Sequence, residues 1–205
     1  MREDRTIFMF RHGQTDWNVA QRFQGHRDVP LNARGLAQAE ALAARVDGLG
    51  IERVVSSDLS RARRTAEAVC ARLGVPLELT ADLREVHIGE YEGMATDEIL
   101  RRFGPDALAM WYAPVRTAAD LELSAPGGEP VGVVIRRVEA LLAAQLERPE
   151  RVVGVSTHGG VLRRMVGWMF PQVEGLDRIG NTTIFELRWA AADASWRYVR
   201  RIDAA

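Results

Sequence analysis

The chain has 205 residues, 27 of them basic and 28 acidic, and a formal net charge of −1. This balance excludes the strongly basic surface of a nucleic-acid-binding protein, and no acidic tail is present. No apolar run approaches about 20 residues, and residues 1–5 are too polar for a signal peptide, so we expect a cytoplasmic protein without membrane contact. The single cysteine, Cys70, excludes an intrachain disulfide.

Short apolar runs alternate with amphipathic segments along the chain. The runs predict strands at 6–10, 53–56, 77–80, 152–157, 183–189 and 196–202. The amphipathic segments predict helices at 35–48, 59–73, 94–103, 106–112, 131–147 and 160–169. This alternation is typical of an α/β fold, here a single-domain three-layer sandwich over residues 1–205 with a mostly parallel sheet flanked by helices. The short stretch 190–195 lets the last two strands pair as a hairpin, which would make the sheet mixed.

The helix predicted at 59–73 has the clearest period. Its apolar positions recur every three or four residues and form one stripe: Leu59, Ala62, Ala66, Val69 and Leu73. Ser57 or Asp58 can cap its start, and Gly74 followed by Pro76 can end it.

Segment 104–126 shows little periodicity and carries two neighbouring aromatic residues, Trp111 and Tyr112. We interpret it as a small lid-like excursion over one edge of the sheet. Its aromatic residues can contact a bound small molecule or form an apolar plug that anchors the excursion. The other tryptophans are predicted to be core or interface residues: Trp17, Trp168, Trp189 and Trp196.

Two of the predicted strands end in a histidine followed by glycine. His12 follows the run 6–10, and His158 follows the run 152–157. Because open α/β sheets place ligand sites at the carboxyl ends of their strands, we expect the two imidazoles to meet at one edge of the sheet. Such a pair suits phosphoryl chemistry on histidine.

His12 is the candidate nucleophile, because a neutral imidazole can attack phosphorus and hold the phosphoryl group covalently. Arg11, its neighbour, can supply positive charge for the phosphoryl oxygens. Arg61 falls in the first turn of the helix 59–73, where free backbone N–H groups and the helix dipole favour anions. Its planar fork also matches phosphate oxygens.

A carboxyl group near the phosphate can protonate the leaving oxygen and then deprotonate the attacking water. Glu85 is a candidate for this role, although spacing alone does not distinguish it from Asp82, Glu90 or Glu92. The chain's four histidines and one cysteine lack the spacing of a zinc site, so no metal is expected.

Several short blocks follow one another along nearly the whole chain. They are 11–18 (RHGQTDWN), 24–25 (QG), 28–31 (DVPL), 56–62 (SSDLSRA), 65–66 (TA), 83–85 (LRE) with Gly89, 92–93 (EG), 127–129 (GGE), 156–160 (STHGG) and Asn181. In this order the blocks resemble the histidine phosphatase superfamily, in its phosphoglycerate-mutase-like branch. The resemblance implies an α/β sandwich with its site at the carboxyl ends of the strands.

The resemblance also implies a role for each matching residue. His12 would be the phosphorylated histidine and Glu85 the proton donor. Three further residues would bind the phosphoryl group: Arg11, Arg61 and His158. The substrate-binding positions would be Asn18, Gln24, Gly25 and Gly159. The partner would be a small phosphate ester, no cofactor or metal is implied, and related proteins often form homodimers.

By this resemblance the chain is expected to be a metal-independent phosphatase of small phosphate monoesters. Cofactor-dependent mutases of the family carry a longer excursion and an extended C-terminal tail, whereas here segment 94–126 is compact and the chain ends at Ala205. We therefore favour hydrolysis, with a bisphosphoglycerate-dependent phosphoglycerate mutase as the alternative. Segments 23–25, 83–89 and 196–197 also resemble phosphatases of glucosyl-3-phosphoglycerate. Phosphoserine, α-ribazole phosphate and sugar phosphates are further substrate candidates.

A non-enzymatic alternative to the phosphatase and the mutase is a binding or regulatory role, because some members of the superfamily have lost activity. Such a protein is expected to lack the histidine, an arginine or the acid. All five catalytic candidates are present in this chain: Arg11, His12, Arg61, Glu85 and His158. Their presence favours an enzyme.

Overall fold

A six-stranded sheet forms the centre of the computed structural model, which describes residues 3–112 and 115–204. The strands are β1 (Arg5–Arg11), β2 (Arg53–Ser57), β3 (Leu77–Thr80), β4 (Val152–Thr157), β5 (Ile184–Ala190) and β6 (Ser195–Ile202), in the spatial order β3-β2-β4-β1-β5-β6. Strands β1 to β4 are mutually parallel, and β5 pairs antiparallel with both β1 and β6. The predicted mixed sheet and its terminal hairpin are confirmed.

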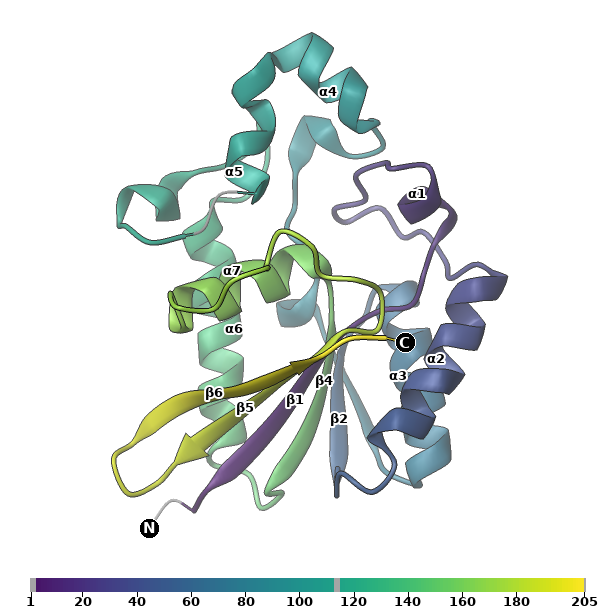
Figure 1. Cartoon of the computed structure of the whole chain (residues 1–205), viewed down its shortest axis with the longest axis vertical. Coiled ribbons are helices and arrows are strands. Elements are labelled where there is room, and N and C mark those ends of the chain that lie inside the picture. Colours follow the sequence, from purple (N-terminus) through teal and green to yellow (C-terminus); the bar gives the residue numbers. More distant parts are fainter. Residues whose placement is uncertain (1–2, 113–114, 205) are drawn as a thin grey trace.

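Four longer helices cover the sheet: α2 (Ala33–Val46), α3 (Ser60–Leu73), α6 (Val131–Gln145) and α7 (Gly159–Met169). Figure 1 shows α2 and α3 on one face of the sheet and α6 and α7 on the other. The predicted three-layer α/β sandwich is therefore confirmed. Within the described ranges, none of the helices is long and apolar enough to cross a membrane.

Shorter helices occupy the connections. They are α1 (Asp16–Val19), α4 (Thr96–Phe103) and α5 (Ala109–Tyr112), with 3-10 helices η1 (Ala81–Leu83), η2 (Gly89–Tyr91), η3 (Pro105–Leu108) and η4 (Ala119–Glu122). The helix predicted at 106–112 is divided between η3 and α5. Helix α1 is absent from the sequence prediction because four residues are too few to show a period. Thr15 and Asn18 form a reciprocal capping box around it.

Helix α3 begins at Ser60, and its N-cap residue, Leu59, makes no side-chain cap. The prediction of Ser57 or Asp58 as the cap was therefore wrong. Instead, the carboxylate of Asp28 accepts the N–H of Ser60 at 2.7 Å across a sequence separation of 32 residues. A loop that is distant in sequence thus satisfies one of the free N–H groups of the first helical turn.

The side chains of the sheet divide between two apolar cores, because successive residues of a strand point to opposite faces. In β1, Phe8 and Phe10 belong to the core shared with α2 and α3, whereas Ile7 and Met9 belong to the core under α6 and α7. Burying each of these side chains contributes about 1.5–3 kcal/mol. A slip of one residue in β1 would exchange the two sets, so packing specifies the register of this strand.

The register between β1 and β4 brings the two histidine-glycine motifs together. Arg11 pairs with Thr157 in the parallel ladder. The next residues, His12 and His158, therefore leave the sheet side by side. The His12 N–H donates to the Thr157 carbonyl at 3.1 Å and extends the ladder by one bond.

Residues 94–126 form an excursion beyond the carboxyl ends of the parallel strands. Figure 1 shows α4 and α5 on that side of the molecule, above the sheet and its covering helices. Ile99 and Leu108 anchor the excursion, since both are buried in the core under α6 and α7. This position is compatible with the predicted lid, which stays a prediction, and residues 113–114 lie outside the described part of the chain.

The N-terminus of α2 packs directly against the loop that follows β1. A Cβ on Gly35 would lie 2.0 Å from the Gln14 carbonyl oxygen. We expect Gly35→Ala to lower the free energy of unfolding by about 1–3 kcal/mol, as overpacking does, in urea denaturation. Gly167→Ala is the control, because its Cβ would meet only Leu176, at 3.4 Å, and alanine favours helix. Equal destabilisation of both variants would contradict this prediction.

Candidate active site

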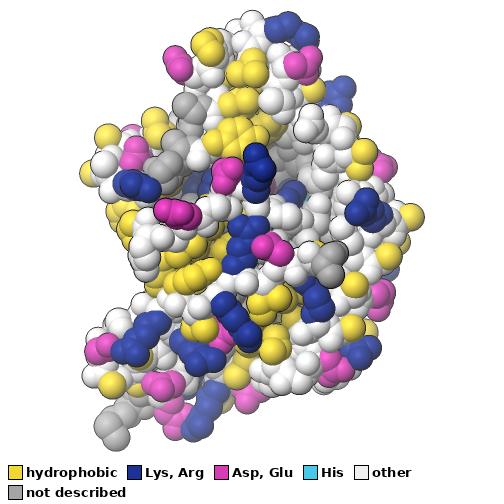
Figure 2. All heavy atoms as spheres, viewed as in Figure 1, with side chains coloured by type: hydrophobic (Ala, Val, Ile, Leu, Met, Phe, Trp, Pro, Cys, Tyr) yellow, Lys and Arg dark blue, Asp and Glu magenta, His cyan; other side chains and the backbone are white. Residues whose placement is uncertain are grey.

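A cavity of about 230 Å³ lies at the carboxyl ends of the parallel strands. Its described lining residues are Arg11, His12, Trp17, Asn18, Gln21, Arg22, Phe23, Gln24, Gly25, Arg61, Glu85, Thr96, Trp111, Tyr112, Gly159, Gly160, Arg163 and Ile179. Figure 2 shows basic side chains along the middle of the face that is drawn. Every predicted site residue except His158 lines the cavity, and His158 lies next to it.

One ring nitrogen of His12 has no hydrogen-bond partner among the described residues. His12 is 2% exposed, and its Nδ1 lies 2.6 Å from the Gly13 carbonyl oxygen. Because a carbonyl oxygen only accepts hydrogen bonds, Nδ1 carries the proton and Nε2 keeps its lone pair. The Gly13 N–H donates to Thr65 Oγ1 of α3 at 3.0 Å, which holds the loop in place. The nitrogen able to attack an electrophile is therefore Nε2.

His158 is fully buried beside His12, with 5.2 Å between the ring centroids in an edge-to-face arrangement. Its Nδ1 accepts the Nε–H of Arg61 at 3.2 Å. The proton of His158 is thus on Nε2, which donates to Ser57 Oγ at 2.9 Å. The ring links α3 and β2 to the end of β4.

Both imidazoles are neutral at neutral pH. Burial is the main cause, and it lowers the pKa of each ring well below the ordinary value of 6.5. The positive charge of Arg61 lowers both further, and that of Arg11 adds to the effect. Neutrality is the state in which His12 can act as a nucleophile.

Two buried guanidinium groups border the cavity. Arg61 is 0% exposed and donates to the carbonyl oxygens of Gly25 at 2.8 Å and Arg27 at 2.9 Å. Arg11 donates from Nη1 to the Ile179 carbonyl at 2.6 Å, and its buried Nε has no partner among the described residues. Burial lowers the pKa of both to about 10, which leaves both positively charged at neutral pH. An anion in the cavity would therefore meet two cations that carbonyl groups position without neutralising.

Backbone N–H groups hold the Glu85 carboxyl group on the cavity wall. Its Oε1 accepts the N–H of Val86 at 2.9 Å, and its Oε2 accepts the N–H of Gly160 at 3.0 Å. Only glycine allows this approach at position 160, because a Cβ there would lie 2.5 Å from Oε1 of Glu85. At 7% exposure the carboxyl group is nearly withdrawn from bulk solvent.

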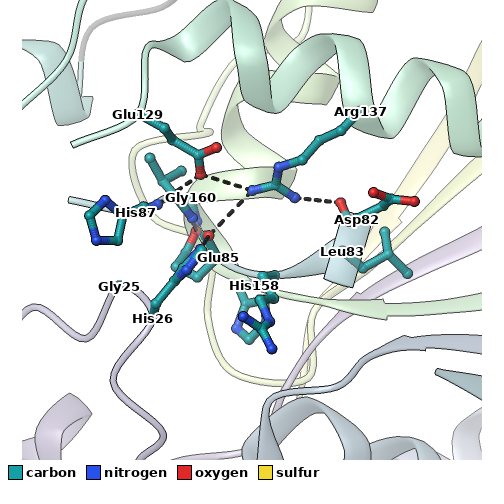
Figure 3. Close-up of polar contacts among 12 residues, drawn as sticks. Gly25, His26, Asp82, Leu83, Glu85, His87, Glu129, Arg137, His158 and Gly160 are labelled. Carbon is teal, nitrogen blue, oxygen red and sulfur yellow. Dashed lines mark hydrogen bonds and ion pairs between the residues drawn. The ribbon is translucent and has the colours of Figure 1, made fainter. Parts of the chain in front are cut away.

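Helix α6 holds the backbone around Glu85. Arg137 donates to the carbonyl oxygens of Asp82 and Glu85, the latter at 3.3 Å, and to the Glu129 carboxylate at 3.0 Å. Glu129 also accepts the N–H of His87 at 2.8 Å. Figure 3 shows these contacts gathered around the segment that carries Glu85. Glu129 of the Gly-Gly-Glu block and Arg137 of α6 therefore fix the backbone of the segment that carries Glu85.

The remaining two histidines lie outside the cavity lining. His26 donates from Nε2 to the Glu85 carbonyl at 2.8 Å, and its ring packs edge to face on His87 with 5.1 Å between centroids. Burial lowers the pKa of His26, which favours its neutral form. Among the described residues, no three His, Cys, Asp or Glu side chains are grouped so as to hold a metal ion.

The predicted substrate-binding residues of the first loop offer polar atoms to the cavity. Asn18 Oδ1 accepts from the Thr15 N–H at 3.1 Å and from the Asn181 amide at 3.3 Å, so its own NH₂ group remains available for a ligand. The Oε1 atom of Gln24 is buried without a partner among the described residues. Gly25 adopts a φ of 52°, a conformation that favours glycine.

One wall of the cavity is aromatic. Phe23 and Trp111 pack edge to face with 5.1 Å between centroids, and Arg163 of α7 lies over the rings of Trp111 at 5.7 Å and Tyr112 at 5.4 Å. Trp111 packs against the core, as the second sequence alternative expects, and it also lines the cavity. Its contact with a bound small molecule stays a prediction. Trp17 lines the cavity too, so its prediction as a core or interface residue was wrong.

Trp111 and Tyr112 line the cavity and were considered as ligand contacts from the sequence. Several other lining residues were not predicted as site residues: Trp17, Gln21, Arg22, Phe23, Thr96, Gly160, Arg163 and Ile179. Arg163 is the one with the most evident chemistry. It lies on α7, five residues after the N-cap residue His158, but nothing in the helical pattern distinguishes it from Arg164. Only the packing of α7 against the excursion decides which of the two lines the cavity.

A family model described as the histidine phosphatase superfamily (branch 1) matches residues 7–202. Phosphoglycerate mutase-like protein 4 of Arabidopsis thaliana is 36% identical over 182 residues, which cover 87% of this chain and 76% of that protein. "Probable phosphoglycerate mutase GpmB" of Salmonella paratyphi B is 34% identical over 144 residues, or 70% of this chain. The match spans 64% of the Salmonella protein, slightly under two thirds.

A solved structure extends this similarity to the whole fold. A mycobacterial glucosyl-3-phosphoglycerate phosphatase in complex with VO3 superposes with a TM-score of 0.82 and 30% sequence identity. The superposition covers 95% of this chain and 97% of that one. All the sequence blocks that carry the resemblance lie inside the matched range 7–202.

Two buried neutral imidazoles make the stability of the fold depend on pH. Unfolded His12 and His158 bind protons near pH 6.5, whereas burial keeps their folded pKa values well below that. The unfolded state therefore binds more protons as the pH falls. The free energy of unfolding should drop by about 2 kcal/mol from pH 6.5 to 5.5, about half from each residue. Urea denaturation should give about half this drop for His12→Gln, and an unchanged drop would contradict a neutral buried His12.

Proposed function

This chain is a phosphatase that belongs to the histidine phosphatase superfamily, and we propose that it hydrolyses small phosphate monoesters through a phosphohistidine formed on His12. One observation carries the proposal: a neutral imidazole with a free Nε2 lines the same cavity as two buried arginines and a fixed carboxyl group. The two arginines are Arg11 and Arg61, and the carboxyl group is that of Glu85. This set matches what phosphoryl transfer to histidine requires.

In the first step the Nε2 lone pair of His12 attacks phosphorus. The bond from phosphorus to the ester oxygen breaks, and the Glu85 carboxyl group gives its proton to the leaving oxygen. Arg11 and Arg61 stabilise the negative charge on the non-bridging oxygens. His158 supports Arg61 through its Nδ1, and its Nε2–H, which donates to Ser57 Oγ, can instead donate to a phosphoryl oxygen.

In the second step water attacks the phosphohistidine. The Glu85 carboxylate takes a proton from this water, the P–N bond breaks, and its electrons return to Nε2 of His12. Inorganic phosphate leaves and the starting protonation state is restored. The reaction needs no cofactor, because histidine is the nucleophile and water the acceptor.

Access of water favours hydrolysis over transfer to a second hydroxyl. The cavity lining includes exposed residues, Gln21, Arg22 and Tyr112, the last of them 46% exposed. A phosphoglycerate mutase is the alternative, supported by the names of two relatives. It shares the first step but excludes water during the second. A cytoplasmic location and a homodimer stay predictions from the sequence.

Replacing the nucleophile tests the central step. We expect His12→Ala to reduce phosphate release from a panel of monoesters by a factor of about 10³ or more, measured with a chelator present. No label should remain on this variant when a reaction with radioactive ester is stopped in alkali. His87→Ala, which removes an imidazole outside the cavity lining, should keep its activity. Near-normal release by His12→Ala would overturn the proposal.

The leaving-group acid has a different kinetic signature. Glu85→Gln should slow hydrolysis of an alkyl phosphate about 10²-fold or more, but hydrolysis of nitrophenyl phosphate much less, because an activated leaving group needs little protonation. The measurement is kcat/KM for the two esters. Glu90→Gln is a matched control, since Glu90 is 50% exposed and paired with Arg102. Equal slowing of both esters by Glu85→Gln would contradict its role as the acid.

A further inference from the structure

The cavity contains more positive charge than a phosphate group alone would balance. Its lining residues include four arginines, Arg11, Arg22, Arg61 and Arg163, and one carboxyl group, that of Glu85. A phosphate monoester carries a charge of about −1.5 to −2 at neutral pH. With Glu85 protonated, as the proposed first step requires, about two positive charges remain without a counterpart when such an ester is bound.

Arg163 is a half-buried cation of the cavity lining that the proposed reaction does not use. Arg11 and Arg61 serve the phosphoryl group. Arg22 is exposed and donates to the Gly93 carbonyl at 2.7 Å. Arg163 is half-buried in α7, and among the described residues no carboxylate lies within ion-pair distance of it.

Carbonyl groups and aromatic rings hold the Arg163 side chain in one orientation. Nε donates to the Leu176 carbonyl at 2.9 Å, Nη2 to that of Asp177 at 3.1 Å, and Nη1 to that of Trp111 at 3.3 Å. The guanidinium also lies over the rings of Trp111 and Tyr112. Of its five N–H groups two stay unused, one on each terminal nitrogen, which suits a bidentate acceptor such as a carboxylate.

The charge of Arg163 acts on the phosphoryl site. Burial lowers the pKa of Arg11, Glu85 opposes this, and the charges of Arg163 and Arg61 lower it further. An anion between these cations would relieve their repulsion. Arg163 lines the same cavity as His12 and Arg61. A single small molecule in this cavity can therefore place one anionic group at the phosphoryl site and a second one at Arg163.

We propose that Arg163 selects substrates that carry a second anionic group, with a carboxylate a few bonds from the phosphate ester as the preferred form. This inference rests on the proposed phosphatase function and narrows its substrate class to phosphorylated acids. The two unused N–H groups of Arg163 bind the carboxylate, and Trp111 and Phe23 pack against the carbon skeleton. A neutral sugar would satisfy these hydrogen bonds but leave the charge uncompensated.

Two esters with the same carbon skeleton test the proposal: 3-phosphoglycerate has a carboxylate where glycerol 3-phosphate has a hydroxymethyl group. For the unmodified protein we expect kcat/KM to favour 3-phosphoglycerate by about tenfold or more. In Arg163→Gln this ratio should fall to about one, mainly through a higher KM for 3-phosphoglycerate. The kcat/KM for nitrophenyl phosphate, which has no second anionic group, should fall much less than that for 3-phosphoglycerate. Arg163→Lys keeps the positive charge but loses the paired N–H donors of the guanidinium group. This variant should retain part of the preference for 3-phosphoglycerate.

Arg101→Gln is the control for loss of a positive charge, because its side chain is 72% exposed on α4 outside the cavity lining. It should leave the ratio unchanged. The proposal is overturned if Arg163→Gln slows all three esters equally, which is the result of a purely structural role. It is also overturned if the unmodified protein does not distinguish 3-phosphoglycerate from glycerol 3-phosphate. In both cases His12-dependent hydrolysis would still support the proposed function, which fails if no ester is hydrolysed or if hydrolysis does not depend on His12.

Discussion

The parallel pairing of β1 with β4 is the constraint on which the whole site depends. It sets Arg11 opposite Thr157 and thereby puts the rings of His12 and His158 in contact, although the two lie far apart in the sequence. Apolar packing holds this register, because a slip of one residue would move the phenylalanines of β1 into the opposite core. The arrangement of the two imidazoles is thus a consequence of how the core packs.

The same packing explains why the cavity stays positive. Arg11, Arg61 and Arg163 satisfy their hydrogen bonds largely with carbonyl oxygens, which position a guanidinium without neutralising its charge. The resulting potential attracts anions, and it also disfavours a proton on His12. Binding of a phosphate and a nucleophilic imidazole are therefore two effects of one electrostatic arrangement.

Residues outside the cavity lining help to hold Glu85 in position for its proposed role as proton donor. Backbone N–H groups on either side orient Glu85, and its own carbonyl is held by Arg137 from α6 and by His26 from the first loop. Neither of these supporting residues lines the cavity. A preorganised group of this kind needs little rearrangement during a reaction.

The sequence by itself determined the strands, the long helices and the residue types of the site, because hydrophobic periodicity and motifs such as that around His12 are contiguous in the chain. Only the tertiary structure decided that Asp28 caps α3, that Trp17 faces the cavity and that Arg163 rather than Arg164 lines it. It also decided which nitrogen of His12 is free. The physical reason is that the first three features depend on contacts between segments distant in sequence, which no local pattern encodes. The His12 tautomer follows from a contact with the neighbouring Gly13 carbonyl, in a loop whose conformation is held by Thr65 of α3.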